Sequence, residues 1–355
     1  MDNSLENSFS KIDETDIISR IQSNPEEKGN YFLLAGYYSS KQDYLKAEEI
    51  LLKLLSIDNS NLNVLISIGS ICFMQRDFER AVKYFNEALE IDTKNYLVYY
   101  NLGNIYAQNQ DVDKASEYYN KAVEYNPLDS LSYSALGLLN QQDKKFAEAL
   151  KYYQKALELD DKNFENYVNV ASVFMQLDDY QAASEFYLKA TEYNPCDFKA
   201  YICAANAFAM NHQFKKSFEL YQKAIEINPA YVPAYICYGI SLSDFNEIDS
   251  AVEKFKTAIK LAPNDSKNNL ILGNCYFEQN KIDEAICCYR QALAAEASNV
   301  NALISLGNAY VVKNKTKEAV NCYQKAIKLT PNNNELQLIY IDMLEEFESS
   351  NQEEK

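Results

Sequence analysis

The chain repeats a pattern of residue types every 34 residues, with no insertion or deletion between copies. Copies that begin at residues 28, 62, 96, 130, 164, 198, 232, 266 and 300 cover residues 28–333. A fixed period of this length is typical of arrays in which each repeat contacts only its neighbours, so no single core has to grow with the chain. Positions within a copy are numbered as places, and place 1 is the first residue of each copy.

Small and large residues alternate at fixed places of the repeat. Place 8 holds only glycine or alanine, and place 20 holds alanine or serine. Place 24 holds a large residue in every copy, namely Leu51, Phe85, Tyr119, Tyr153, Tyr187, Tyr221, Phe255, Tyr289 and Tyr323. Places 4, 7, 8 and 11 form one helical stripe, and places 20, 24, 27 and 28 form another. Each repeat is therefore predicted to be two short helices that approach closely at the small residues.

The ends of the array depart from the pattern. Ile17 and Ile21 lie on the same lattice before the first copy, and proline at place 32 closes several copies. Ile341 stands where glycine or alanine is required, as expected if no further helix follows. The predicted divisions are an acidic segment 1–27 with a half-repeat helix 11–24, nine repeats at 28–61, 62–95, 96–129, 130–163, 164–197, 198–231, 232–265, 266–299 and 300–333, a capping helix 334–348 and a disordered acidic tail 349–355.

Charge and cysteine usage narrow the class of protein. Of the net charge of −17, residues 1–27 carry −5 and residues 334–355 carry −6. No basic face tracks a phosphate backbone, so nucleic-acid binding is not expected. Residues 1–10 lack the apolar core of a signal peptide, and no segment is apolar enough for direct membrane insertion. The eight cysteines contain no CxxC pair. We expect reduced thiols and a cytoplasmic location, with the nucleus as an alternative.

Residues that could support catalysis or hold a metal are scarce. His212 is the only histidine and occupies place 15, in the expected turn between helices, where a surface role is commoner than a catalytic one. Cys287 and Cys288 are adjacent and Cys322 lies one period after Cys288, which is not the spacing of a zinc site. No glycine-rich phosphate loop occurs. We expect no enzyme activity, no metal and no cofactor.

The repeated motif identifies a known family. The segments YYNLGNIYAQNQDVDKASEYYNKAVEYNP and ISLGNAYVVKNKTKEAVNCYQKAIKLTP resemble the tetratricopeptide repeat (TPR), with tyrosine or leucine replacing tryptophan at place 4. The resemblance covers all nine copies. It implies an all-α solenoid, a right-handed superhelix of antiparallel helix pairs, with the first helix of each pair lining a concave groove. It also implies that places 2, 5, 6, 9, 12 and 13 face this groove.

Residues at these places predict a peptide-binding groove with an apolar floor and regularly spaced amides. The predicted site residues are Tyr100, Asn101, Asn104, Gln108, Val168, Asn169, Gln176, Ile202, Asn206, Ile236, Leu270, Asn274 and Asn308. Amide side chains both donate to and accept from a peptide backbone. The pattern is similar to the asparagine ladder in the TPR domain of O-linked N-acetylglucosamine transferase, although Leu138 and Ile240 interrupt it. Alternatively, these asparagines belong to the repeat signature and persist through duplication.

The leading hypothesis is a non-catalytic adaptor or scaffold that binds an extended segment of a protein or peptide. Two alternatives stay open. One is a structural core subunit of a multiprotein assembly, as in the anaphase-promoting complex, the BBSome or intraflagellar transport particles. The other is the targeting partner of a separate glycosyltransferase chain. TPR clamps for the C-terminal carboxylates of Hsp70 and Hsp90 use lysine at place 5, which no copy has, so such binding is disfavoured. Self-association is compatible with each hypothesis.

Overall fold

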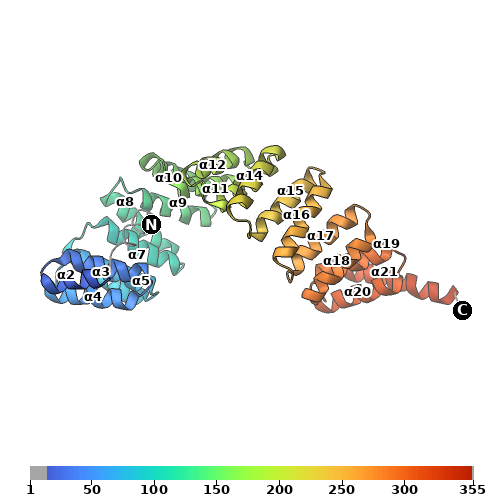
Figure 1. Cartoon of the computed structure of the whole chain (residues 1–355), viewed down its shortest axis with the longest axis horizontal. Helices are drawn as coiled ribbons and strands as arrows, with labels where there is room; N and C mark the ends of the chain where they lie inside the picture. The colour runs from blue at the N-terminus through green and yellow to red at the C-terminus, as the bar shows by residue number, and fades with distance from the viewer. Residues whose placement is uncertain (1–13, 354–355) are drawn as a thin grey trace. The chain divides into compact units, whose positions relative to one another are not determined.

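The computed structural model describes residues 14–353, and the side chains through Glu345. Twenty helices and no strand are present in this part of the chain, which confirms the predicted all-α class (Figure 1). The helices fall into two compact parts, residues 1–169 and 170–355, and each part is described by itself. Helix α11 (Phe164–Gln176) contains the boundary between them.

Consecutive helices form pairs that pack against each other in both parts. The first part holds α2 (Glu14–Ser23), α3 (Lys28–Ser40), α4 (Tyr44–Ile57), α5 (Leu62–Met74), α6 (Phe78–Ile91), α7 (Tyr96–Gln108), α8 (Val112–Tyr125), α9 (Ser130–Gln142) and α10 (Phe146–Leu159). The second part holds α12 (Tyr180–Tyr193), α13 (Phe198–Met210), α14 (Phe214–Ile227), α15 (Val232–Asp244), α16 (Ile248–Leu261), α17 (Ser266–Glu278), α18 (Ile282–Ala295), α19 (Val300–Val312), α20 (Thr316–Leu329) and α21 (Asn334–Glu353).

Side-chain caps begin many of these helices. Asn95 and Asp129 lie directly before α7 and α9, and their side chains accept hydrogen bonds from the backbone N–H groups of Val98 and Ser132. Asp111 caps α8 in the same way. Each cap satisfies one of the N–H groups that the first turn of a helix leaves without a partner. These capping residues therefore explain where α7, α8 and α9 start.

The turn inside each pair uses a backbone conformation that residues other than glycine rarely adopt. Place 15 has a φ between 55° and 66° in nine turns of the described chain, at Gln42, Arg76, Gln110, Lys144, Asp178, His212, Asn246, Asn280 and Asn314. In one of them, the N–H of Arg76 donates to the carbonyl of Phe73 and the N–H of Asp77 to that of Cys72. These bonds satisfy the last carbonyls of the first helix, as in a Schellman motif. The left-handed residue thus reverses the chain between two tightly packed helices.

The small residue at place 8 allows the ring at place 24 to lie against the backbone of the first helix. A methyl group added at Gly103 would come within 2.5 Å of the Tyr119 ring, and one at Gly239 within 2.4 Å of Phe255. Both rings are buried. The predicted close approach of the two helices is therefore a direct contact between ring and backbone.

The terminal helices differ in length from the predicted ones. Helix α2 runs from Glu14 to Ser23, and the predicted residues 11–13 lie outside the described residues. Its Ile17 is buried in the core of the first part. Helix α21 continues to Glu353, beyond the predicted end at residue 348, so most of the predicted tail is described as helix; residues 354–355 are outside the description. No helix among the described residues is both long and apolar enough to cross a bilayer.

The contact between ring and glycine predicts opposite effects for the same substitution at two sites. Gly239→Ala should lower stability by about 1–3 kcal/mol, because the buried Phe255 ring has to move. Gly29→Ala meets nothing within 4 Å and should be neutral or raise stability by up to about 1 kcal/mol through helix propensity. Urea midpoints followed by circular dichroism compare the two variants. Equal effects at both sites would show that the ring does not press on the backbone at Gly239.

Candidate functional site

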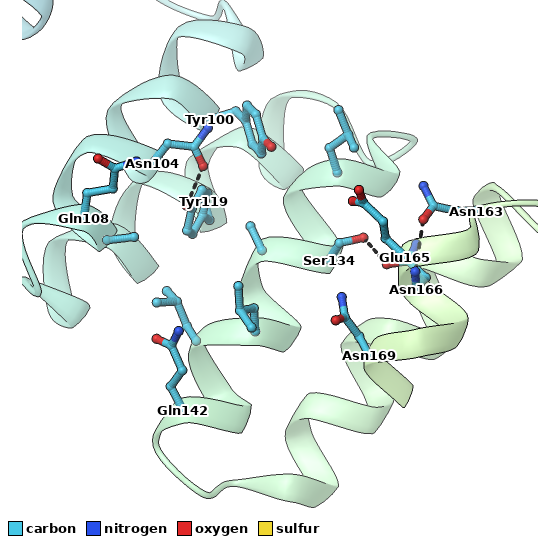
Figure 2. A pocket seen from close by; sticks show the side chains of 15 residues that line it. Tyr100, Asn104, Gln108, Tyr119, Ser134, Gln142, Asn163, Glu165, Asn166 and Asn169 are labelled. Atoms are coloured by element: carbon cyan, nitrogen blue, oxygen red, sulfur yellow. Dashed lines mark hydrogen bonds between the residues drawn. The ribbon is translucent and has the colours of Figure 1, made fainter. Parts of the chain in front are cut away.

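A cavity of about 370 Å³ lies among the first helices of three consecutive pairs, α7, α9 and α11 (Figure 2). Its volume is near the lower end of the range of about 300–1,000 Å³ found for ligand pockets. All of its lining residues belong to the first part of the chain: Tyr100, Asn104, Ala107, Gln108, Tyr119, Leu131, Ser134, Ala135, Leu138, Leu139, Gln142, Asn163, Glu165, Asn166 and Asn169. The cavity therefore brings together four of the predicted site residues, namely Tyr100, Asn104, Gln108 and Asn169.

The lining combines an apolar middle with a polar rim. Leu131 and Leu138 of α9 are 47% and 45% exposed, which is high for large apolar side chains in a cavity. Amide side chains from α7, α9 and α11 also line the cavity, and Figure 2 shows Asn104, Gln142 and Asn169 among them. This arrangement suits a ligand that has apolar groups and also many hydrogen-bonding groups, as an extended peptide does.

The amide of Asn104 is held by a hydrogen bond that was not predicted from the sequence. The hydroxyl of Tyr119, on α8, donates to Asn104 Oδ1 over 2.7 Å (Figure 2). Burial raises the pKa of the Tyr119 phenol, so this hydroxyl stays protonated and requires an acceptor. Asn104 therefore satisfies a buried core tyrosine from the surface of the first helix.

The same bond recurs wherever asparagine occupies place 9. Tyr289 donates to Asn274 Oδ1 over 2.9 Å, and Tyr323 donates to Asn308 Oδ1 over 2.7 Å. Tyr221 donates to Asn206 Oδ1. Where place 24 holds Phe85 or Phe255, place 9 holds Ser70 or Ile240 instead. The sequence carries this signal, because asparagine at place 9 appears only together with tyrosine fifteen residues later.

These bonds change the chemistry expected of the ladder. The carbonyl oxygen of each amide accepts a hydrogen bond from a tyrosine hydroxyl, and this bond fixes the direction in which the N–H groups point. The structure therefore adds to the sequence-based view that these amides are held in one orientation by the core tyrosines. Two repeats with tyrosine at place 24 lack asparagine at place 9. Place 9 is Ser172 in the repeat of Tyr187 and Leu138 in that of Tyr153, whose hydroxyl donates to Gln141 Oε1 over 3.0 Å.

A second polar pair lies in the cavity between α9 and α11. Ser134 Oγ is 2.6 Å from Asn166 Oδ1 and 2.9 Å from the carbonyl oxygen of Ser130 (Figure 2). Asn166 is only 1% exposed, and its Nδ2 is buried without a hydrogen-bond partner. Such atoms are rare in folded proteins and costly to leave unpaired. Asn166 was missed at the sequence level, because its place 3 is not among the groove places.

The charged residues at the cavity are acidic. Glu165 is the only acidic or basic residue among the lining residues. Burial raises the pKa of the Tyr100 phenol, and the carboxylates of Asp129 and Glu165 raise it further, whereas a hydrogen bond with Asn104 acts in the opposite direction. The cavity is thus weakly negative and has no basic side chain.

The structure distributes the other predicted residues outside this cavity. Asn274 and Asn308 line a smaller cavity of about 200 Å³ in the second part, together with Tyr289 and Ser305. The Asn101 amide donates to the carbonyl of Leu97 in its own helix over 2.8 Å. Ile202 is buried, Gln176 is exposed, and the remaining residues Val168, Asn206, Ile236 and Leu270 are partly buried. No group of three or more His, Cys, Asp or Glu side chains within residues 14–345 is placed to hold a metal ion.

Comparison with known proteins identifies the repeated unit. Models described as tetratricopeptide repeat match residues 29–61, 73–139, 130–163 and 164–195, and a model described as TPR repeat matches residues 273–312 and 307–338. These matches together cover more than half of the chain. No curated protein sequence matches significantly.

One solved structure among those compared shows the same fold. A tetratricopeptide repeat protein from Parabacteroides merdae superimposes with a TM-score of 0.52 at 20% identity, covering 70% of this chain and 98% of its own. MamA gives a TM-score of 0.46 at 24% identity over 49% of this chain and 96% of its own. YrrB, described as a TPR protein with an unusual peptide-binding site, gives a TM-score of 0.42 at 22% identity. The match covers 54% of this chain and 97% of YrrB.

The bond between tyrosine and asparagine predicts a compensating pair of substitutions. Asn274→Ile should lower stability by about 1 kcal/mol or more, because the Tyr289 hydroxyl loses its acceptor. Adding Tyr289→Phe should restore most of the loss, since the preceding repeat has the corresponding pair Ile240 and Phe255. Urea midpoints of the two single variants and the double variant measure the coupling. Purely additive effects would show that the bond contributes nothing.

Buried tyrosines predict a loss of stability in alkali. Burial is the main cause that raises the pKa of Tyr289 from 10.0 to about 12, so the folded chain keeps this proton at pH values where the unfolded chain has lost it. This contribution to stability is complete below pH 10 and is lost as the pH rises towards 12. Urea midpoints across this range should fall less steeply for Tyr289→Phe than for the wild type. The control Tyr193→Phe, at an exposed tyrosine, should leave the slope unchanged.

Proposed function

The chain belongs to the tetratricopeptide repeat family, and we propose that it is a non-catalytic adaptor or scaffold that holds an extended segment of another protein. The segment lies along the first helices of the nine repeats at 28–333. In this proposal, places 5, 6, 9 and 13 of successive repeats supply the contact surface. The cavity between α7, α9 and α11 is the best-formed part of that surface.

The observation that carries the proposal is the fixed orientation of the place 9 amides. Tyrosine hydroxyls hold the oxygens of Asn104, Asn274 and Asn308, so the N–H groups are directed without any ordering by the ligand. A donor that is already oriented loses less conformational entropy on binding. Each bond to a peptide carbonyl contributes only about 0.5–1.5 kcal/mol, so affinity requires several repeats. This favours a long, extended ligand over a compact one.

The chemistry of the same places argues against two other ligand classes. Carboxylate tails of the Hsp70 and Hsp90 kind need lysine at place 5, where this chain has eight apolar or aromatic residues and Ser134. Nucleic acid needs a basic face, and the net charge is −17. We therefore propose protein segments as the ligand, and not nucleic acid or chaperone tails.

An exposed apolar face on α21 supports a second candidate, a core subunit of a larger assembly. Leu338 and Ile341 are 63% and 48% exposed, although both are large and apolar. They occupy places 5 and 8, which correspond in the repeats to positions facing a ligand or a second helix. A neighbouring subunit could cover this face end to end. Binding through the groove and binding through the exposed face of α21 can be told apart, because different substitutions should weaken each.

Three conservative substitutions test the adaptor proposal. Asn104→Asp, Asn274→Asp and Asn308→Asp together keep an oxygen for each tyrosine hydroxyl but remove the N–H donors. The control carries the same charge change at exposed asparagines of second helices, Asn86→Asp, Asn120→Asp and Asn321→Asp. Affinity capture from native extract, quantified by mass spectrometry, compares both variants with the wild type.

We expect the ladder variant to lose about tenfold or more of particular partners that the control variant retains, because about 0.5–1.5 kcal/mol is removed at each of three places. Matching circular dichroism and urea midpoints establish that both variants are folded. If both variants retain the same partners at the same levels, the groove is not the working surface. Loss of partners by Leu338→Lys instead would then favour the assembly subunit.

A further inference from the structure

We propose that the cavity between α7, α9 and α11 is an anchor pocket for one uncharged apolar side chain of the bound segment, with a lysine or arginine next to it in the peptide sequence. The inference rests on the proposed function and gives it a sequence preference. Three features of the pocket support the proposal. They are an empty space over α9, a buried amide that lacks a hydrogen-bond partner, and a single carboxylate among the lining residues.

The hollow exists because α9 departs from the other first helices. Place 5 is apolar or aromatic in eight repeats, as Phe32, Ile66, Tyr100, Val168, Ile202, Ile236, Leu270 and Ile304, but serine in the fourth. Ser134 and the adjacent Ala135 leave space over α9, and Leu131, Leu138 and Leu139 make its surface apolar. An apolar side chain from a ligand would fill this space and bury the two exposed leucines.

The wall of the pocket holds a polar group with unmet hydrogen-bonding capacity. The single hydroxyl proton of Ser134 has two acceptors within reach, the Ser130 carbonyl and Asn166 Oδ1. Whether this hydroxyl donates to the Ser130 carbonyl or to Asn166 Oδ1, at least one polar atom of the buried Asn166 amide has no hydrogen-bond partner. A peptide group carries both an N–H and a C=O and, once the buried amide turns towards the cavity, can complete the pair in either case. A purely apolar ligand would leave the Asn166 amide without a hydrogen-bond partner, and the free-energy cost of that would remain.

The rim selects by charge. Glu165 lies at place 2 of α11 and is the only charged lining residue. At the six groove places of the second to fifth repeats, no other charged residue occurs. A cation on the ligand beside the apolar anchor would therefore meet one carboxylate and no competing base, whereas an acidic residue would be repelled. This polarity is the reverse of that of a clamp for carboxylate tails.

Selection from a degenerate peptide pool tests the pocket directly. Full-length wild-type chain is immobilised, the retained peptides are sequenced, and the most enriched sequence is synthesised for binding measurements. Ser134→Ile fills the hollow with the residue that Ile66 and Ile202 provide at the same place, and Ser134→Thr is its control. Glu165→Lys reverses the rim charge, and Glu335→Lys makes the same change at place 2 of α21, far along the chain from the pocket.

The wild type should enrich leucine, isoleucine or methionine beside lysine or arginine. Ser134→Ile should weaken the selected peptide by about tenfold and abolish the apolar preference, while Ser134→Thr retains both. Glu165→Lys should remove the basic preference and weaken binding by about threefold to fivefold at low salt, as for a partly exposed ion pair. Glu335→Lys should change neither.

The outcomes separate the two proposals. If the wild type retains peptides without an apolar and basic pair, or if Ser134→Ile and Glu165→Lys behave like their controls, the anchor pocket is wrong and the adaptor proposal stands. If the wild type retains no peptide above an unfolded control, the adaptor proposal fails and the anchor pocket fails with it. Because Glu165 is exposed, its variant stays informative even if Ser134→Ile does not fold.

Discussion

The repeat depends on the contact between an aromatic ring at place 24 and the bare backbone of the first helix at place 8. In the third repeat the Tyr119 ring covers Gly103 so closely that no Cβ fits between them. This contact requires a small residue on one helix and a large one on the other. When the ring is tyrosine it also carries a hydroxyl to the surface of the first helix, where a buried O–H has to find an acceptor. Asn104 supplies that acceptor and becomes part of the candidate site.

One interaction therefore serves both core and surface. The bond from Tyr289 to Asn274 satisfies the core, and it also orients an amide on the exposed side of α17. Asparagine at this place accepts from the tyrosine hydroxyl in four of the six repeats that have tyrosine at place 24, so its presence there does not require a ligand. The sequence pattern alone could not tell whether asparagine at place 9 serves the core or a ligand. Replacement by aspartate can, because the tyrosine keeps its acceptor while the ligand loses its donor.

Most of the local structure could be predicted from the sequence, because the spacing of small and large places repeats without a break. The bond from tyrosine to asparagine could also have been found, since Phe85 and Phe255 lack asparagine fifteen residues before them. The left-handed residue at place 15 could be predicted only in part. Arg76, Lys144 and Gln110 all adopt it, although such residues are strained in this conformation. Place 15 holds Asn or Asp, which tolerate this conformation better than other residues with a Cβ, in four of the nine turns, so the sequence carries only a partial signal for it.

The candidate pocket also illustrates where an array of equal repeats can become selective. A residue that makes the contact between ring and backbone cannot change without loss of stability, as the small residue at Gly137 shows beside Tyr153. Groove places do not make this contact, so a departure there alters the surface while ring and backbone stay packed. At place 9 the tyrosine hydroxyl then needs another acceptor, which Gln141 is for Tyr153. Ser134 and Leu138 are such departures, and they lie one turn apart on α9. Selectivity for particular ligands should therefore come from the fourth repeat. Its groove places differ most from those of the other repeats, while its core places keep the common pattern.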